Sequence, residues 1–230
     1  YFVGHFDGTS FVNANAAEEV LWLDTGRDFY APQSFFDPEG APTIMAWASN
    51  WRYARQTPTT GFRGAASLPR QLSLTATPDG LRVAQKVPEA VTQAFSERRD
   101  RATYHHRFRL ERGGAGDVSI ALFGEAAPQY RLRHDPEGRV SITSVRAPHA
   151  AMPDFGYSLT RGIGWPPDRP VSVDLYVDRG LVEIFVADGT LSLTDLHFPQ
   201  APEGPLTLTH HARAAFQHAQ QPLLKGGHNG

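Results

Sequence analysis

The sequence has no cysteine among its 230 residues, which excludes disulfide bonds and thiol chemistry and leaves the cellular compartment open. It also lacks any apolar run approaching the roughly 18 residues that a membrane-spanning helix needs. Charge of one sign is not in excess either, because the formal net charge is −2. No internal repeat is evident. Nucleic acids and membranes are therefore not expected as partners.

The first residues also lack the pattern of a leader segment. The opening residues 1–11 lack the basic start and apolar core of a signal peptide, and the chain does not begin with Met. They are typical of a strand and turn that already lie inside a domain. We therefore expect a fragment or a processed form of a longer protein.

Helical patterns are scarce. Glycine (21) and proline (18) together make about one residue in six, which favours short strands and turns over helices. One weak helix is predicted at residues 90–101. Strands are predicted at residues 1–3, 10–12, 20–23, 31–36, 43–47, 65–74 and 81–87. A second series is predicted at residues 104–110, 118–123, 130–133, 140–145, 171–177, 181–186, 191–196 and 205–209, with the turn spacing of an antiparallel sandwich.

The aromatic residues are unevenly placed. Eight of the 25 lie within residues 23–74, interleaved with Gly, Pro, Asp and Asn rather than on a helical stripe. They are Phe29, Tyr30, Phe35, Phe36, Trp47, Trp51, Tyr53 and Phe62. From about residue 88 aromatics thin out and alternating strands follow. The texture of the sequence thus changes once, near residue 88.

Several ordered motifs within the aromatic-rich stretch resemble a known family. They are Asp-Phe-Tyr-Ala-Pro-Gln-Ser-Phe at 28–35, Ala-Trp-Ala-Ser-Asn-Trp-Arg-Tyr-Ala at 46–54, Phe-Arg-Gly-Ala at 62–65 and Ser-Leu-Pro-Arg-Gln-Leu at 67–72. Val-Glu-Ile-Phe at 182–185 continues the series. Together they resemble glycoside hydrolase family 32, the β-fructofuranosidases, and within it the levanase and exo-inulinase branch.

This resemblance implies an all-β fold, the closing part of a five-bladed β-propeller followed by a C-terminal antiparallel β-sandwich. Residues 1–74 would be the C-terminal part of the propeller, residues 75–87 a linker or hairpin, and residues 88–230 the sandwich. The change of texture near residue 88 agrees with that division and depends only on the residues themselves.

The resemblance also implies a retaining glycosidase that releases fructose from levan, inulin or sucrose with two carboxylates. The family carries its nucleophile in a Trp-x-Asn-Asp-Pro motif, a stabilising Asp in Arg-Asp-Pro and its acid in a Glu-Cys pair. None of these motifs occurs here. We therefore expect no catalytic residue in this chain, and no activity from the chain alone.

Three acidic positions imitate such motifs. Asp-Pro-Glu-Gly occurs at residues 37–40 and again at 135–138, and both runs are typical of turns between strands. Glu183 is expected to point outward from its strand, where the resemblance makes it a feature of the sandwich rather than a reacting group.

Two aromatics are the main sugar-binding candidates by resemblance. Trp47 corresponds to a tryptophan against the fructose subsite, and Tyr30 to a tyrosine that lines it. A flat ring offers a furanose an apolar platform, and a phenol adds an orienting hydrogen bond. Asp28, Gln33 and Asn50 complete the predicted substrate-binding set. The alternative is that the rings are core aromatics and that the three polar side chains support loops.

Neighbouring side chains are given structural roles. Trp51 and Tyr53 are expected to pack within the sheet, and Arg63 and Arg70 to pair with nearby carboxylates or backbone. The pairs His105-His106 and His210-His211 predict no metal site, because adjacent strand residues point to opposite faces. No cofactor is expected.

The expected partners are a fructan or sucrose substrate and the missing N-terminal propeller blades, in the same or a second chain. An extracellular or periplasmic location follows from the habit of the family alone. Two other functions stay open: a non-catalytic fructan-binding or complementing subunit of a split enzyme, and a stand-alone sugar-binding lectin.

Overall fold

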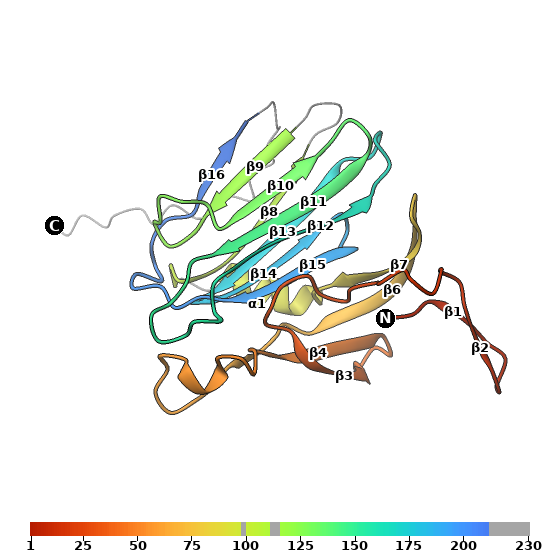
Figure 1. The fold of residues 1–230 in the computed structure, drawn as a ribbon, viewed down its shortest axis with the longest axis horizontal. Helices are drawn as coiled ribbons and strands as arrows, with labels where there is room; N and C mark the ends of the chain where they lie inside the picture. Colours follow the sequence, from red (N-terminus) through yellow and green to blue (C-terminus); the bar gives the residue numbers. More distant parts are fainter. Residues whose placement is uncertain (98–99, 111–115, 212–230) are drawn as a thin grey trace.

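The structure is a computed structural model that describes residues 1–97, 100–110 and 116–211. Within these ranges it contains sixteen strands, one α-helix and one short 3₁₀ helix, so the all-β prediction is confirmed. No helix in the described ranges is long and apolar enough to cross a membrane. Figure 1 shows three stacked sheets, with α1 beside the boundary between the lower two, which is here called the junction.

Two antiparallel sheets form a sandwich from residue 103 onward. The four-stranded sheet has the order β15-β14-β13-β8 and the five-stranded sheet the order β12-β11-β10-β9-β16. The four-stranded sheet comprises β8 (Thr103–Leu110), β13 (Val171–Asp178), β14 (Leu181–Val186) and β15 (Leu191–Leu196). The five-stranded sheet comprises β9 (Gly116–Ala121), β10 (Tyr130–His134), β11 (Arg139–Arg146), β12 (Tyr157–Gly164) and β16 (Thr207–His210).

The core of the sandwich lies between these two sheets. Every second residue of β10 and β11 is buried, as the alternation in the sequence predicts. The inward side chains include Phe108, Leu132, Ile184 and Trp165, each at most 2% exposed. This half of the chain therefore has a complete hydrophobic core of its own.

A third sheet, here called the N-terminal sheet, packs against the four-stranded face of the sandwich (Figure 1). It has the order β3-β4-β6-β7, and the short β5 also pairs with β4. Its strands are β3 (Tyr30–Phe36), β4 (Pro42–Ala48), β5 (Ala65–Ala66), β6 (Arg70–Thr77) and β7 (Gly80–Lys86). β6 and β7 form a hairpin in continuous register from Gln71–Lys86 to Thr77–Gly80. Both strands of this hairpin are thus part of the sheet.

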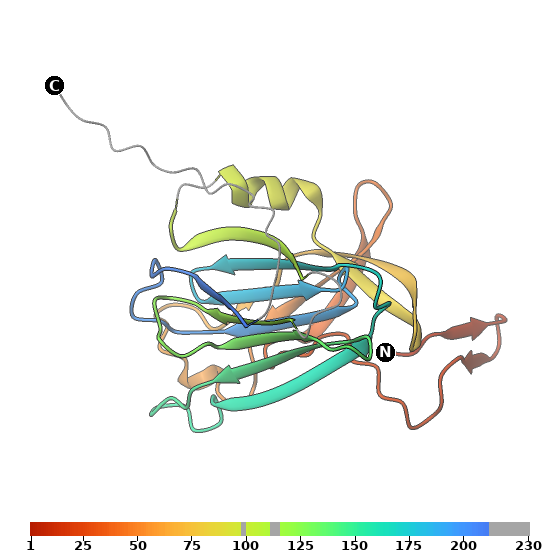
Figure 2. The same ribbon diagram turned by 90° about the horizontal axis from the view of Figure 1, so that it is seen from above.

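The N-terminal hairpin forms at a register different from the predicted one. The strands are β1 (Gly4–Phe6) and β2 (Phe11–Asn13), whereas residues 1–3 and 10–12 were expected. The Asp7 carboxylate accepts the backbone N–H groups of Thr9 and Ser10, so the turn is fixed there and the strands begin directly beside it. The strand predicted at residues 20–23 is absent. Figure 2 shows the hairpin extending away from the rest of the chain.

The predicted helix is present as α1 (Glu89–Glu97), and residues 98–99 lie outside the described ranges. Its apolar side chains Val91 and Phe95 pack against Val87, Tyr176 and Phe185. The helix therefore lies against the outward side of β13 and β14, next to the end of β7.

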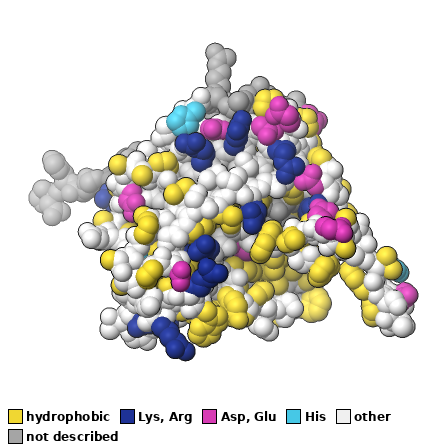
Figure 3. Space-filling view, viewed as in Figure 1, with side chains coloured by type: hydrophobic (Ala, Val, Ile, Leu, Met, Phe, Trp, Pro, Cys, Tyr) yellow, Lys and Arg dark blue, Asp and Glu magenta, His cyan; other side chains and the backbone are white. Residues whose placement is uncertain are grey.

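Exposed apolar surface is concentrated in the first part of the chain. Among the described residues fourteen large hydrophobic side chains are exposed, and thirteen of them lie within residues 2–81. The exception is Val145 on β11. Figure 3 shows hydrophobic side chains gathered on the face where β3 and β4 lie. The described part of the sandwich exposes almost no large apolar side chains, whereas the first 81 residues, including the N-terminal sheet, expose many.

Candidate functional site

Three aromatic rings, here called the aromatic cluster, meet at one end of the N-terminal sheet. Tyr30 begins β3, Trp47 lies opposite it on β4, and Trp51 follows β4 in a loop. The ring centroids are 6.1 Å apart for Tyr30–Trp47, 6.3 Å for Tyr30–Trp51 and 5.0 Å for Trp47–Trp51. The three rings thus form one continuous surface.

The backbone of β3 is irregular beside the aromatic cluster. The register of β3 on β4 shifts between Tyr30 and Gln33, and Ala31 has a positive φ of 49°. An irregularity of this kind turns a side chain out of the ordinary alternation. Tyr30 is therefore aimed separately from the rest of its strand.

The aromatic cluster is open to solvent. Tyr30 is 50% exposed and Trp51 60% exposed, while Trp47 is half-buried. The Trp47 indole Nε1 donates to the carbonyl oxygen of Arg63 at 3.3 Å, which fixes the edge of the ring. Trp51 was expected to pack inside the sheet, and that interpretation is wrong. An accessible surface of three rings has the chemistry to accept the apolar face of a sugar.

Gln33, the next polar candidate, is exposed on β3 beyond the register shift. Its side chain is accessible to a ligand on the same strand that carries Tyr30. Contact of Gln33 with a sugar hydroxyl stays a prediction.

Asp28 lies elsewhere, and its prediction as a sugar ligand is corrected by its burial. The side chain has no exposed surface. Its Oδ2 accepts from the backbone N–H of Leu196 at 2.9 Å and pairs with Arg146 Nη1 at 2.5 Å. Its Oδ1 accepts from the Tyr53 hydroxyl. Every oxygen of this carboxylate is already used inside the protein, so no hydroxyl of a sugar can reach it.

Asn50 supports a loop, which corrects its prediction as a sugar ligand. Its Nδ2 donates to the carbonyl oxygen of Arg27 at 2.8 Å, and its Oδ1 accepts from the backbone N–H of Arg52 at 3.0 Å. The alternative reading of loop support is the one the structure bears out. Tyr53, 1% exposed, is buried as expected, but it packs against Met152 and Phe155 of the sandwich rather than within the N-terminal sheet.

The acidic imitators are structural. Asp37 accepts the backbone N–H groups of Glu39 and Ala41, and Asp135 accepts that of Arg139, so both runs are turns as predicted. Glu183 does point away from the sandwich core, but it is covered by the N-terminal sheet and only 1% exposed. The expectation of an outward-facing side chain is corrected in that respect.

Glu183 takes part in a buried ion pair across the junction. Its Oε2 accepts from Arg70 Nε at 3.1 Å and Nη2 at 2.5 Å, and its Oε1 accepts from the Leu68 backbone N–H at 2.6 Å. Arg70 also pairs with Asp24 at 2.8 Å. The predicted pairing of Arg70 with a carboxylate is thus confirmed.

A second arginine is buried at the junction. Arg146 pairs with Asp28 and lies 3.8 Å from Asp195 Oδ1. Burial opposes the charged guanidinium, and the charges of Asp28 and Asp195 outweigh it, so the pKa of Arg146 is raised. Two carboxylates that share one arginine could be mistaken for a glycosidase pair, but neither side chain has exposed surface. They hold the arginine and cannot meet a substrate.

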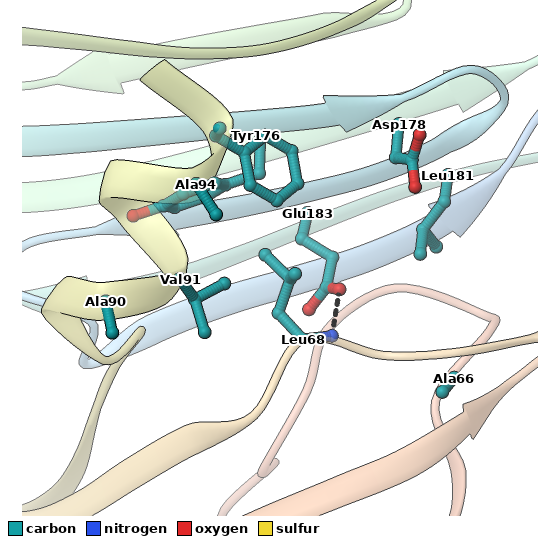
Figure 4. A pocket seen from close by; sticks show the side chains of 10 residues that line it. Ala66, Leu68, Ala90, Val91, Ala94, Tyr176, Asp178, Leu181 and Glu183 are labelled. Carbon is teal, nitrogen blue, oxygen red and sulfur yellow. Dashed lines mark hydrogen bonds between the residues drawn. The ribbon is translucent and has the colours of Figure 1, made fainter. Parts of the chain in front are cut away.

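A pocket of about 350 Å³ opens where α1, the N-terminal sheet and β13–β14 meet. Its lining residues include Leu68, Val91, Tyr176 and Glu183. Figure 4 shows Glu183 hydrogen-bonded to the backbone of Leu68 at the edge of this pocket. None of the five predicted substrate-binding residues lines it. It is a groove at the junction and separate from the aromatic cluster.

No group of three or more His, Asp or Glu side chains in the described ranges is arranged to hold a metal ion. His105 bonds Asp174 at 2.6 Å, while His106 tilts toward Phe108 on the other side of the strand. The opposite orientations expected for this pair are present.

Arg146 and Asp195 were missed from the sequence, and Trp51 was assigned to packing. Arg146 could have been noticed, because it continues the inward series of β11, Val140, Ile142 and Ser144. A charge in an inward position predicts a buried partner. Nothing near Asp195 gives a comparable signal.

Comparisons with known proteins agree with the motifs. Residues 1–86 match the family description "Glycosyl hydrolases family 32 N-terminal domain", and residues 73–220 match "Glycosyl hydrolases family 32 C terminal". A levanase of Bacillus subtilis is 30% identical over 90% of this chain and 34% of its own length. An invertase of Schwanniomyces occidentalis is 46% identical over 32% of this chain and 14% of its own.

The fold matches solved structures as well. An exo-inulinase of Aspergillus awamori superposes with a TM-score of 0.72 at 22% identity, covering 90% of this chain and 46% of that protein. The chain thus spans about a third of the length of the levanase and about half of the inulinase structure.

Proposed function

Because the chain belongs to glycoside hydrolase family 32, we propose that it is part of a retaining enzyme that releases fructose from levan, inulin or sucrose. In this proposal the N-terminal sheet is the closing part of a five-bladed β-propeller, within residues 1–74 and the hairpin of residues 75–87. Residues 88–230 are the C-terminal sandwich. The aromatic cluster is what remains of the sugar site.

The observation that carries the proposal is the open aromatic cluster at the edge of an uncovered sheet. Trp47 offers a flat apolar face, Tyr30 adds a phenol beside it, and Gln33 is accessible on the same strand. A furanose ring has one apolar face and several hydroxyls, so this combination suits it.

The reacting carboxylates are proposed to lie on polypeptide other than this chain. The chain spans 34% of the levanase it matches, and thirteen of its fourteen exposed large hydrophobics lie within residues 2–81. The distribution is explained if the apolar face of the N-terminal sheet is buried against that other polypeptide. The missing partner is then the preceding blades, in the same chain or a second one.

The test is an assay of fructose release from sucrose, inulin and levan. We expect no turnover by the 230-residue chain, and turnover once it is co-expressed with the N-terminal portion of a family relative. Trp47→Ala in the complemented enzyme should raise KM by about tenfold, the loss of roughly 1.4 kcal/mol of sugar contact. Turnover by the chain alone would overturn the placement of the carboxylates.

Phe62→Ala is the matched control. Phe62 is 61% exposed in the neighbouring loop, like Trp51, but makes none of the ring contacts of the aromatic cluster. Its removal should leave KM unchanged. An equal effect of both substitutions would indicate a general loss of surface and not a sugar contact.

The alternative is a non-catalytic fructan-binding or complementing subunit. The complete core of the sandwich favours it, because that half needs no further polypeptide to bury its apolar side chains. Binding of fructan that survives Trp47→Ala would favour a lectin-like site in the sandwich. We further propose an extracellular or periplasmic location; one relative, 26% identical over 89% of this chain, is named an extracellular exo-inulinase.

A further inference from the structure

The aromatic cluster is carried by two separate segments. Tyr30 ends the first, residues 27–30, and Trp47 and Trp51 belong to the second, residues 47–53. Asn50 in the second segment donates to the carbonyl oxygen of Arg27 in the first at 2.8 Å. The Tyr53 hydroxyl donates to Asp28 Oδ1. The relative position of the rings therefore depends on how these two segments are tied together.

The tie is completed by the sandwich. Arg146, at the end of β11, donates from Nη2 to the Tyr53 hydroxyl at 2.7 Å and pairs through Nη1 with Asp28 at 2.5 Å. One guanidinium thus reaches both segments.

The same guanidinium is fixed from the side of the sandwich. Its Nε donates to the carbonyl oxygen of Phe155 at 2.9 Å and its Nη1 to that of Leu196 at 2.8 Å. The ring centroid of Phe155 lies 3.9 Å from the guanidinium carbon. Arg146 is therefore held in one orientation before it meets Asp28 and Tyr53.

We propose that Arg146 is a positioning residue for the aromatic cluster, so that the sandwich sets the geometry of the sugar surface. The inference rests on the proposed function for its meaning, but its geometric content stands alone. Tyr30 follows Asp28 by two residues and Trp51 precedes Tyr53 by two, so a shift of either anchor moves a ring.

Burial makes the arrangement specific. Asp28 is 0% exposed and Arg146 3% exposed. A buried carboxylate without its cation is costly, and the Nε, Nη1 and Nη2 atoms of Arg146 all donate to acceptors inside the protein. We expect an exposed ion pair to permit several relative positions of the two segments, whereas the buried pair of Arg146 and Asp28 favours one.

The experiment uses the 230-residue chain with 5-fluorotryptophan in place of its four tryptophans, followed by ¹⁹F NMR. Arg146→Lys and Tyr53→Phe should displace or double the resonances of Trp47 and Trp51. Trp165, 1% exposed in the sandwich core, should stay in place as the internal reference. Single Trp→Phe variants assign the four resonances.

Tyr130→Phe is the matched control. Its hydroxyl lies 3.2 Å from Asp195 Oδ2 and 2.7 Å from His197 Nε2, so the variant loses a buried phenol of the same kind. The Tyr130 hydroxyl contacts neither segment directly and reaches the first one only through Asp195, which accepts from the Arg27 backbone N–H at 3.4 Å. It should lower stability and leave the Trp47 and Trp51 resonances unchanged.

The inference is overturned if Tyr53→Phe and Arg146→Lys move the two resonances no more than Tyr130→Phe does. Should Arg146→Lys fail to fold, Tyr53→Phe decides alone. In the complemented enzyme Tyr53→Phe should raise KM with kcat unchanged, as expected for lost sugar contact. If the Trp47 and Trp51 resonances are displaced but Trp47→Ala leaves KM of the complemented enzyme unchanged, the positioning role is supported and the proposed function is rejected.

Discussion

At the scale of single residues, Gly64 shows how the position of Trp47 is fixed. Its φ of +72° lies in the left-handed region, and a Cβ there would come within 2.2 Å of Trp47 Nε1 and 2.8 Å of Ser49 Cβ. Only glycine allows both the backbone conformation and the close approach. The indole edge and its bond to the Arg63 carbonyl therefore depend on the missing side chain at this position.

We predict that Gly64→Ala lowers the free energy of unfolding by about 2–3 kcal/mol, from backbone strain plus the clash with the indole. Gly61→Ala is the control, because Gly61 has a φ of +85° and nothing within 4 Å of its Cβ position. It should lose only about 1 kcal/mol, from the backbone. Urea unfolding measures both, and equal losses would show that Trp47 does not rest on Gly64.

His197 gives a second prediction, for the effect of pH. The residue is 9% exposed, and burial lowers its pKa to about 3, with the charge of Arg146 acting in the same direction. In the unfolded chain the pKa is about 6.5. Stability from this group is therefore complete above pH 6.5 and falls as the pH decreases toward 3, because only the unfolded chain binds the proton.

The slope should approach about 1.4 kcal/mol per pH unit below pH 6. We expect His197→Gln to reduce the loss of unfolding free energy between pH 7 and 5, measured by urea titration at each pH. His134 and His210, whose pKa values burial also lowers, leave a residual slope. Identical slopes in the variant and the parent would contradict the assignment.

The sequence predicted the accessibility of the rings better than that of the polar groups, while sugar contact by the rings stays a prediction. Trp47 and Tyr30 could be predicted by resemblance, and both lie together on an open surface. Asp28 and Asn50 could not, because a carboxylate or amide bonds a sugar hydroxyl and a buried donor equally well. The deciding partner of Asp28 is Arg146, 118 residues further along the chain. No local pattern contains that information.

At the scale of elements, β3 has unusual exposure. All seven of its residues are exposed, including Phe35 at 44% and Phe36 at 76%, and it pairs on one side only, with β4. An exposed edge with large apolar side chains is a site of association between chains. In the proposed enzyme this edge and its faces meet the preceding blades.

We predict that Phe36→Glu increases the monomeric fraction of the isolated chain, because a charge on an exposed edge opposes pairing of strands. Its effect on unfolding should stay within about 0.5 kcal/mol, as for other exposed positions. Sedimentation velocity over a range of concentrations gives the readout.

Val145→Glu is the control, since Val145 is 45% exposed and is the one large exposed hydrophobic outside residues 2–81 in the described ranges. It should leave self-association unchanged. If it raises the monomeric fraction as much as Phe36→Glu does, association does not depend on β3.

Elements with strong alternation could be predicted from the sequence, and short ones could not. β10 and β11 follow the alternation of buried and exposed residues, because one face of each is covered, whereas β14 and β15 are buried on both faces under the N-terminal sheet. Residues 20–23 have the same apolar character but form no strand, and Trp22 there is 56% exposed. A short apolar run predicts burial, and what covers it decides whether it also pairs.

At the scale of the whole molecule, each half of the chain contributes one arginine that is buried against a carboxylate of the other half. Arg70 of the N-terminal sheet is buried against Glu183 of the sandwich, and Arg146 of the sandwich is buried against Asp28. Each half thus supplies the charge that the other half requires, so neither interface surface is self-sufficient.

We predict that Arg70→Met lowers the free energy of unfolding by about 3–5 kcal/mol, because Glu183 and Asp24 stay buried without their cation. Arg169→Met is the comparison: its partner Asp188 is 46% exposed, and Arg169 is 49% exposed. That loss should be below about 1 kcal/mol. Chemical denaturation followed by circular dichroism tests both, and similar losses would mean that the junction adds little.

This reciprocal pairing of arginines and carboxylates limits which gene segments of related proteins can be recombined. A sandwich grafted from a relative would fit this N-terminal sheet only if it brought an acid at position 183 together with an arginine at position 146. The recipient would need Arg70 and Asp28 in turn. We expect these four positions to be inherited as a set, so that the border between the two halves is a poor crossover point even though it lies between two folding patterns.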